Sequence, residues 1–163
     1  MKRFLVLLLA ALFVLPLAGC GEQSLPRDFY SLHSATEQGV DVGTIWLGMT
    51  KEEQRAAIGD ASGLVTLILK LGYVNDILVS MTGLTGVNHP VGITFDMTKD
   101  QIEAYYAKDP DVTVTEEPNL LTATKTIDGT LYYTRIVLWN DGTIKETNQT
   151  TDPSVYQLQF PKQ

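Results

Sequence analysis

Two short stretches of this chain, GMTKEEQ at 48–54 and DMTKDQI at 96–102, carry nearly the same phrase at an interval of 48 residues. In each stretch a threonine stands three residues before a Glu or a Gln, which is the pattern of a helix capping box. Such a box bonds the backbone N–H groups that the first turn of a helix leaves unpaired. The sequence therefore predicts two helices that begin in the same way.

The flanking residues predict where these helices end. The first runs from Lys51 to about Ile58, where Gly59 suits the end of a helix. The second runs from Lys99 to about Lys108, because Pro110 cannot continue it.

After the first helix the apolar residues recur at every second position, which is the period of a strand. Residues 64–73 and 77–81 flank a short polar turn and are predicted as a hairpin. A buried helix is the alternative interpretation of residues 64–73, because a short apolar run does not separate the two.

The second helix is followed by clearer strand signals. Residues 120–127 and 130–139 flank Asp128 and Gly129, and Asp-Gly between alternating segments is typical of a hairpin turn. Residues 143–149 are nearly all polar, so we expect them to form an edge strand. Residues 112–116 are predicted as a further short strand.

These elements predict an α+β fold made of two helix-plus-antiparallel-hairpin repeats, with the helices packed on one face of the sheet. The first repeat spans residues 44–92 and the second spans residues 93–163. We expect both to belong to one compact domain, since 144 residues follow the first 19.

The phrase and its hairpin resemble the fold shared by the β-lactamase-inhibitor-protein family and the BamE-type outer-membrane assembly lipoproteins. The matching residues are Ile45, Gly48, Met49, Thr50, Glu53 and Gly59, and in the second copy Ile93, Met97, Thr98 and Gln101. The tandem arrangement is similar to that of the inhibitors, although Asp96 stands where the first copy has Gly48. The resemblance implies a fold and does not transfer a function.

The amino terminus predicts export. Residues 1–19 contain Lys2 and Arg3, then an apolar run, which is the composition of a secretory signal peptide. The tetrad LAGC at 17–20 resembles a bacterial lipobox, which implies that Cys20 is lipidated after cleavage. An ordinary signal peptide is one alternative, and a retained membrane anchor is another, although a spanning helix needs roughly 20 apolar residues.

The expected location is the bacterial cell envelope, at the outer membrane or the extracellular face of the plasma membrane, with the chain held by lipid on Cys20. Cys20 is the only cysteine, so the exported chain forms no internal disulfide. Residues 20–43 show no regular period and are predicted as a flexible tether.

The charge argues against nucleic acid as a partner. The formal net charge is −7, and it becomes −9 without the leader, which holds two basic residues and no acidic one. Phosphate backbones and anionic lipid headgroups repel such a domain. Membrane contact is therefore expected only through the lipid on Cys20.

The exported sequence carries no recognisable catalytic constellation. It has two histidines, His33 in the expected tether and His89 in a loop, and zinc sites need three or four ligands. It also lacks a nucleophile elbow and a glycine-rich phosphate loop. We therefore expect no enzyme activity, no metal site and no cofactor.

One strand suggests a binding surface. On residues 130–139 the alternation places Tyr133, Arg135 and Trp139 on one face, and the charge of Arg135 favours the outer face. Aromatic residues beside Arg are typical of interface hot spots. In the alternative interpretation the two aromatic rings cover the edge of the core while Arg135 extends to solvent.

The leading hypothesis is a non-catalytic accessory module that binds another envelope protein. The alternative is a carrier or sensor of a small apolar ligand, held between helices and sheet. For the carrier, the candidate pocket residues are Leu67, Leu69, Ile102 and Tyr105.

Overall fold

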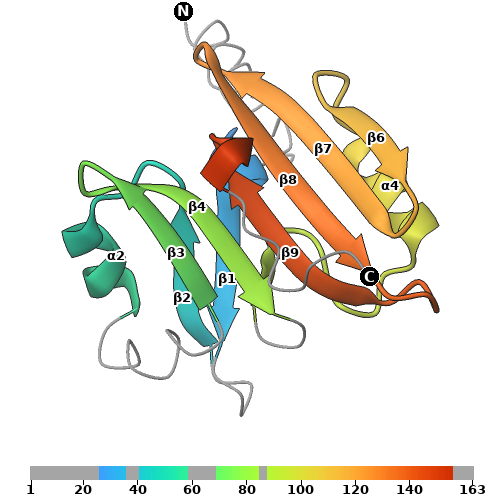
Figure 1. The fold of residues 1–163 in the computed structure, drawn as a ribbon, viewed down its shortest axis with the longest axis horizontal. Coiled ribbons are helices and arrows are strands. Elements are labelled where there is room, and N and C mark those ends of the chain that lie inside the picture. Colours follow the sequence, from blue (N-terminus) through green and yellow to red (C-terminus); the bar gives the residue numbers. More distant parts are fainter. Residues whose placement is uncertain (1–25, 36–40, 59–68, 85–87, 156–163) are drawn as a thin grey trace, which may run out of the picture.

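The structure, a computed structural model, describes residues 26–35, 41–58, 69–84 and 88–155 of the 163-residue chain. The described chain forms a mixed α+β fold with two antiparallel sheets (Figure 1), so the α+β part of the predicted fold class is confirmed. The leader, Cys20 and Leu67 lie outside the described residues.

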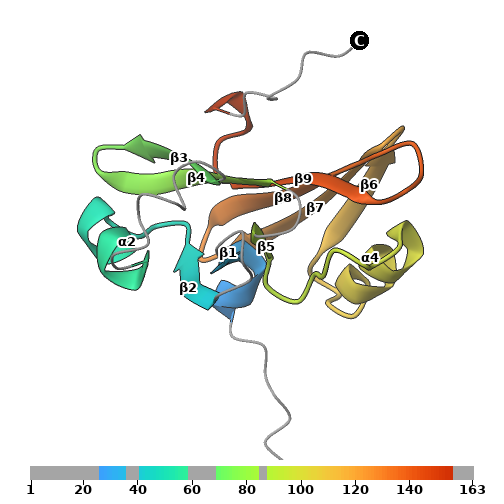
Figure 2. The same ribbon diagram turned by 90° about the horizontal axis from the view of Figure 1, so that it is seen from below.

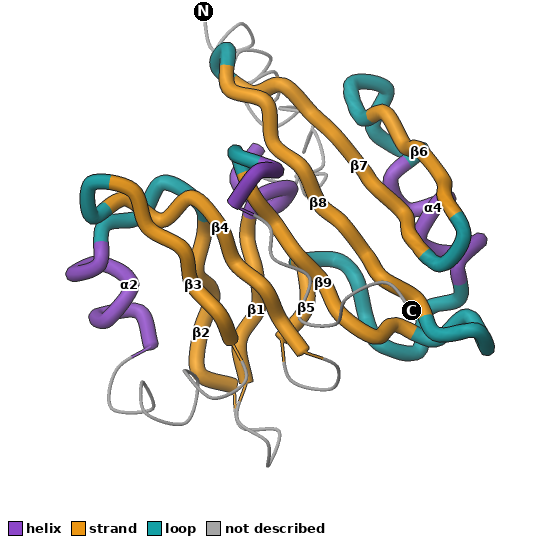
Figure 3. The backbone as a smooth tube through the Cα atoms, viewed as in Figure 1, coloured by secondary structure: helices purple, strands orange, loops and turns teal. Residues whose placement is uncertain are grey.

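The larger sheet has six strands in the order β3-β4-β9-β8-β7-β6, and every neighbouring pair is antiparallel. Figure 3 follows these strands along the backbone. They are β3 (Leu69–Val74), β4 (Ile77–Leu84), β6 (Thr113–Glu117), β7 (Leu120–Ile127), β8 (Thr130–Leu138) and β9 (Ile144–Thr150). The predicted hairpins β3-β4 and β7-β8 are thus confirmed for the described residues, with 64–68 of the first lying outside them, and the short strand predicted at 112–116 is present at Thr113–Glu117.

Both hairpin turns use residues that tolerate left-handed backbone. Asn75 and Asp76 join β3 to β4 with φ of 50° and 65°, and Asp128 and Gly129 join β7 to β8 with φ of 50° and 78°. Positive φ at both central positions is the requirement of the turn that matches the twist of paired strands. This local chemistry explains why these hairpins could be predicted.

Three short strands form the smaller sheet, in the order β2-β1-β5. A 3₁₀-helix, η1 (Pro26–Tyr30), leads into β1 (Ser31–Ala35), which pairs with β2 (Asp41–Trp46) and β5 (Asn88–Pro90). The tether prediction is therefore wrong for residues 26–35 and 41–43. Leu32 is fully buried at the centre of this sheet, so the segment contributes to the core.

The two α-helices, α2 (Lys51–Ile58) and α4 (Lys99–Tyr106), lie on the same side of the larger sheet as the smaller sheet does (Figure 2). Both capping boxes are present. The Thr98 backbone N–H donates to Gln101 Oε1 at 2.8 Å, and the Thr50 N–H donates to a Glu53 carboxylate oxygen at 2.8 Å. The first helix has the predicted bounds, and the second ends two residues before Lys108.

The apolar interior is divided into two clusters. The first core consists of Leu32, Ile45, Leu47, Met49, Ile58, Leu69, Leu78 and Met81. The second core consists of Ile93, Ile102, Tyr106, Leu121, Ala123, Ile136, Leu138 and Ile144. Each α-helix contributes to a different core, so each half of the larger sheet has its own apolar layer.

The prediction that residues 143–149 form an edge strand is wrong, because β9 lies at the centre of the sheet between β4 and β8. Glu146, Thr147, Asn148, Gln149 and Thr150 are all at most 2% exposed. Several of their polar groups form hydrogen bonds, whereas Thr147 Oγ1, Asn148 Oδ1 and Gln149 Oε1 have no hydrogen-bond partner among the described residues. Asn148 Nδ2 donates to Ser80 Oγ, the Met81 carbonyl and Thr82 Oγ1 at 3.2, 3.2 and 3.0 Å.

A substitution at Asn148 tests this central position. We expect Asn148→Ala to lower the free energy of unfolding by about 1–3 kcal/mol, because it removes a buried donor and leaves its acceptors unpaired. Urea denaturation measures the change. The control is Thr126→Ala, since Thr126 is an exposed residue of β7. Its free energy of unfolding should lie within about 0.5 kcal/mol of the wild-type value. An equally small effect at Asn148 would contradict the central placement.

Candidate functional site

The outer face of the larger sheet, opposite the helices, carries the residues predicted as a binding surface. On β8, Thr134, Ile136 and Leu138 are buried toward the cores. Alternation then places Tyr133 and Arg135, both half-buried, on the opposite face. Their predicted orientation agrees with the structure.

Two aromatic side chains of this face are paired with cations. The Arg135 guanidinium carbon lies 6.0 Å from the centre of the Tyr133 ring, and Lys145 Nζ lies 4.5 Å from the centre of the Trp139 ring. Trp139 is 51% exposed. We call Tyr133, Arg135, Trp139 and Lys145 the aromatic–cation strip. Its rings place apolar area next to two positive charges on one face of the sheet.

Lys145 was missing from the sequence prediction, and the reason is a register shift. Val137 pairs with Glu146, whereas Leu138 pairs with Ile144, so Lys145 is the extra residue of a bulge. Strict alternation does not place an inserted residue, and no other sequence signal placed Lys145 beside Trp139.

A groove of about 420 Å³ adjoins the strip at the end of β8. Three segments form it, namely the start of α4, the β6-β7 turn and the β8-β9 turn. Its lining residues are Lys99, Glu116, Glu117, Pro118, Asn119, Leu138, Trp139, Asn140 and Gly142. The Asn119 side-chain amide donates to Asn140 Oδ1 at 3.0 Å and joins the two turns.

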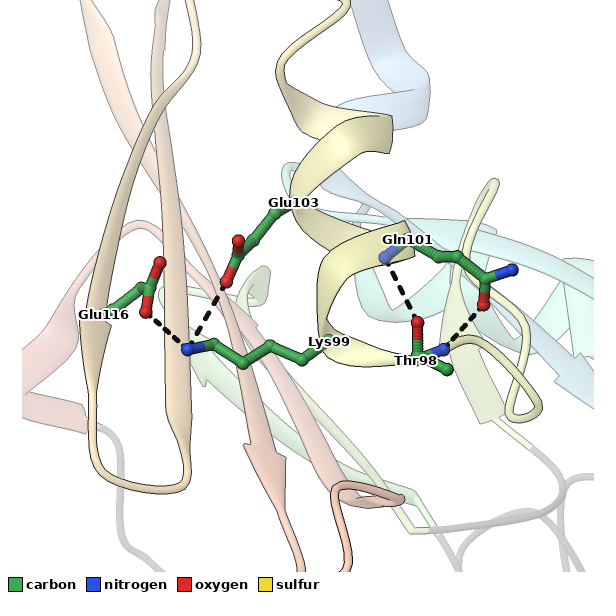
Figure 4. Close-up of polar contacts among 5 residues, drawn as sticks. All are labelled: Thr98, Lys99, Gln101, Glu103 and Glu116. Carbon is green, nitrogen blue, oxygen red and sulfur yellow. Dashed lines mark hydrogen bonds and ion pairs between the residues drawn. The ribbon is translucent and has the colours of Figure 1, made fainter.

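Lys99 forms ion pairs with two carboxylates beside the groove (Figure 4). Its ammonium is paired with Glu116, and it lies 3.5 Å from Glu103 Oε1 one turn along α4. The hydrogen bond from Lys99 holds the pKa of the Glu116 carboxyl below its usual value, and the same contact raises the pKa of Lys99. Helix α4 is thereby tied to the edge strand β6.

The structure separates the residues of the predicted apolar pocket. Leu69 belongs to the first core, Ile102 belongs to the second, and Tyr105 packs against the second. The Tyr105 hydroxyl donates to the Val91 carbonyl at 3.3 Å, which makes it a structural contact. The three described residues therefore do not line one cavity, because the polar strand β9 separates the cores.

Within the described ranges, no group of three or more His, Cys, Asp and Glu side chains is placed to hold a metal ion. The described helices include none that is long and apolar enough to cross a membrane. Comparison of the chain with family models, curated proteins and solved structures finds no match. The resemblance to the inhibitor and BamE-type families accordingly remains a prediction.

The Lys99 contact has a pH consequence that can be measured. Because the folded pKa of Glu116 lies below 4.5, its contribution to stability is present above pH 4.5 and is lost as the pH falls through the lower value. Carbon-detected NMR should give a midpoint below 4.5 for Glu116 in the wild type. We expect Lys99→Met to raise it toward the usual value. Lys51→Met, on the other helix, is the control, and an unchanged midpoint in Lys99→Met would refute the assignment.

Proposed function

We propose that this protein is a lipid-anchored accessory module of the bacterial envelope that binds another protein through the aromatic–cation strip and has no catalytic role. The observation that carries the proposal is Trp139, which is 51% exposed and has Lys145 Nζ 4.5 Å from its ring. An exposed indole held by a neighbouring cation is partly preorganised, so less side-chain entropy is lost when a partner binds.

The composition of the strip supports a protein partner. Trp, Tyr and Arg are the residues enriched among interface hot spots, and Tyr133, Arg135 and Trp139 supply one of each on a single face. Two adjacent pairs of ring and cation offer apolar area together with directional hydrogen-bond donors.

Charge indicates the kind of partner surface. Arg135 and Lys145 lie on this face of a chain whose formal net charge is −7. A partner patch with exposed carboxylates and aromatic rings would complement them. Since rim charges act mainly on the association rate, association should slow as ionic strength rises.

We also propose that the fold arose from two helix-plus-hairpin units. Helices α2 and α4 are both eight residues long and start 48 residues apart. Each is followed by an edge strand of the larger sheet and then by that strand's neighbour, β3-β4 after α2 and β6-β7 after α4. This equivalence supports the repeat and the resemblance to the tandem inhibitor architecture.

The carrier hypothesis receives less support. An apolar ligand needs one continuous apolar cavity, and Leu69 and Ile102 lie in different cores. The groove at the end of β8 is lined largely by charged and amide side chains, so it does not suit an apolar ligand either.

Site-specific photocrosslinking tests the proposed surface. A photoreactive amino acid at Val137, between the strip residues, should crosslink one envelope protein in living cells. Trp139→Ala combined with Tyr133→Ala should reduce the yield at least tenfold, because hot-spot truncations cost about 2 kcal/mol or more.

The matched control is Val74→Ala, since Val74 is also 51% exposed but lies on edge strand β3. It should leave the yield unchanged. Equal yields from wild type and the double variant would exclude the strip as the binding surface.

The proposed anchor is tested separately. Cys20→Ser should abolish incorporation of labelled palmitate, because the proposed anchor is lipid on that residue. Palmitate labelling measures the effect. A Cys20→Ser chain that still incorporates palmitate would show that the lipid is attached elsewhere.

A further inference from the structure

The only two histidines of the chain, His33 and His89, are cross-strand neighbours in the smaller sheet. They stand directly opposite each other on β1 and β5, with ring centroids 5.1 Å apart and ring planes inclined by 39°. Strands β1 and β5 run side by side in Figure 3. We propose that this pair binds one divalent late transition-metal ion, with Cu²⁺ bound most tightly.

The pair lies on the outer face of the smaller sheet. Leu32 and its register partners Ile45 and Pro90 are buried toward the larger sheet. Alternation therefore places His33 and His89 on the opposite face, together with the exposed Thr44. A metal ion from solvent would meet both imidazoles on this face.

The separation of the rings suits one shared metal. With nitrogen–metal bonds of about 2.0–2.1 Å, two neighbouring imidazoles on one ion have ring centroids roughly 4.5 Å apart in the square-planar geometry that Cu²⁺ prefers and roughly 5 Å apart in a tetrahedral one. The observed 5.1 Å lies close to this range, and antiparallel pairing of β1 with β5 holds the two backbones opposite each other. Only rotations about the side-chain bonds are needed to direct two nitrogens at one ion.

Neighbours of His89 hold its ring in place. Its Nδ1 lies 3.2 Å from the Pro90 carbonyl oxygen, and the Phe95 ring packs edge-on against it at 5.4 Å and 88°. When Nδ1 carries the proton and donates to that carbonyl, Nε2 keeps its lone pair for a metal. A backbone carbonyl behind a histidine ligand is the usual way in which proteins fix the tautomer.

The electrostatics keep the donor in its neutral form. Burial lowers the pKa of His89 below its ordinary value of 6.5, and the nearby His33 lowers it further. Hydrogen bonds to the Pro90 and Ile93 carbonyls act in the opposite direction but do not reverse the shift. The neutral imidazole that binds metal thus predominates at pH 7.

Donor chemistry selects the class of ion. Imidazole nitrogens suit copper, nickel and zinc, with Cu²⁺ highest in the usual affinity order, whereas Mg²⁺ and Ca²⁺ prefer oxygen. Two protein donors leave the remaining positions to water or to a donor from another molecule. The smaller sheet lies on the helix side of the larger sheet (Figure 2), and alternation along β8 places the aromatic–cation strip on the other side, so this proposal is independent of the proposed function.

Titration of the full chain in detergent with CuCl₂ at pH 7.4 tests the proposal. Calorimetry should show a site of one ion per chain whose affinity falls at least tenfold in His33→Ala and in His89→Ala. Thr44→Ala, on the same face of the next strand, should retain wild-type affinity. Any contribution from the amino-terminal region is the same in all these variants.

Electron paramagnetic resonance supplies a readout that does not depend on affinity. Bound Cu²⁺ should show coupling to two imidazole nitrogens in the wild type and to one in His33→Ala. The circular dichroism spectrum of each variant shows whether it folds. If His89→Ala does not fold, the comparison of wild type with His33→Ala tests the proposal. Equal affinities in wild type and His33→Ala, or a wild-type spectrum without two coupled nitrogens, would overturn the proposal.

Discussion

The backbone carbonyl of Phe29 accepts two hydrogen bonds from the inner face of the larger sheet, and the arrangement of both cores depends on them. Thr134 Oγ1 donates at 3.2 Å from β8, and Gln149 Nε2 donates at 2.9 Å from β9. These bonds fix η1 beneath the centre of the sheet. The next residue, Tyr30, then leads directly into β1, so the same contact positions the smaller sheet.

Adjacent residues of η1 enter different cores. The Phe29 ring packs edge-on against Tyr106 of the second core at 6.0 Å, whereas the Tyr30 ring stacks on Tyr132 beside the first core at 4.5 Å. Two clusters that share no buried apolar residue are in this way connected by two consecutive side chains. For the polar strand β9, η1 supplies one acceptor, the Phe29 carbonyl that binds Gln149, while β4 supplies the acceptors for Asn148.

Local chemistry accounts for what the sequence could predict. Capping boxes and an Asp-Gly turn act within a few residues, so α2, α4 and the β7-β8 hairpin could be placed in advance. The position of β9 could not, because its burial depends on β4, far away in the sequence. A strand whose side chains are mostly polar is ordinarily an edge. Here Asn148 finds its partners on β4 and not within its own hairpin.

The same distinction between local signals and long-range pairing applies to the candidate sites. Tyr133 and Arg135 could be assigned to one face by alternation along a single strand, which is local information. Lys145 could not be assigned to this face in advance, because it is the extra residue of a bulge in β9. The approach of His33 to His89 could not be predicted either, because these paired residues lie 56 residues apart in the sequence. Strand β1 continues directly from η1 and pairs with β5. At Gly83 of β4 an added Cβ would come within 2.7 Å of a backbone oxygen of β5, so the two sheets are in close backbone contact. The segment that joins the two cores, η1, therefore also leads into the strand that carries one of the two imidazoles.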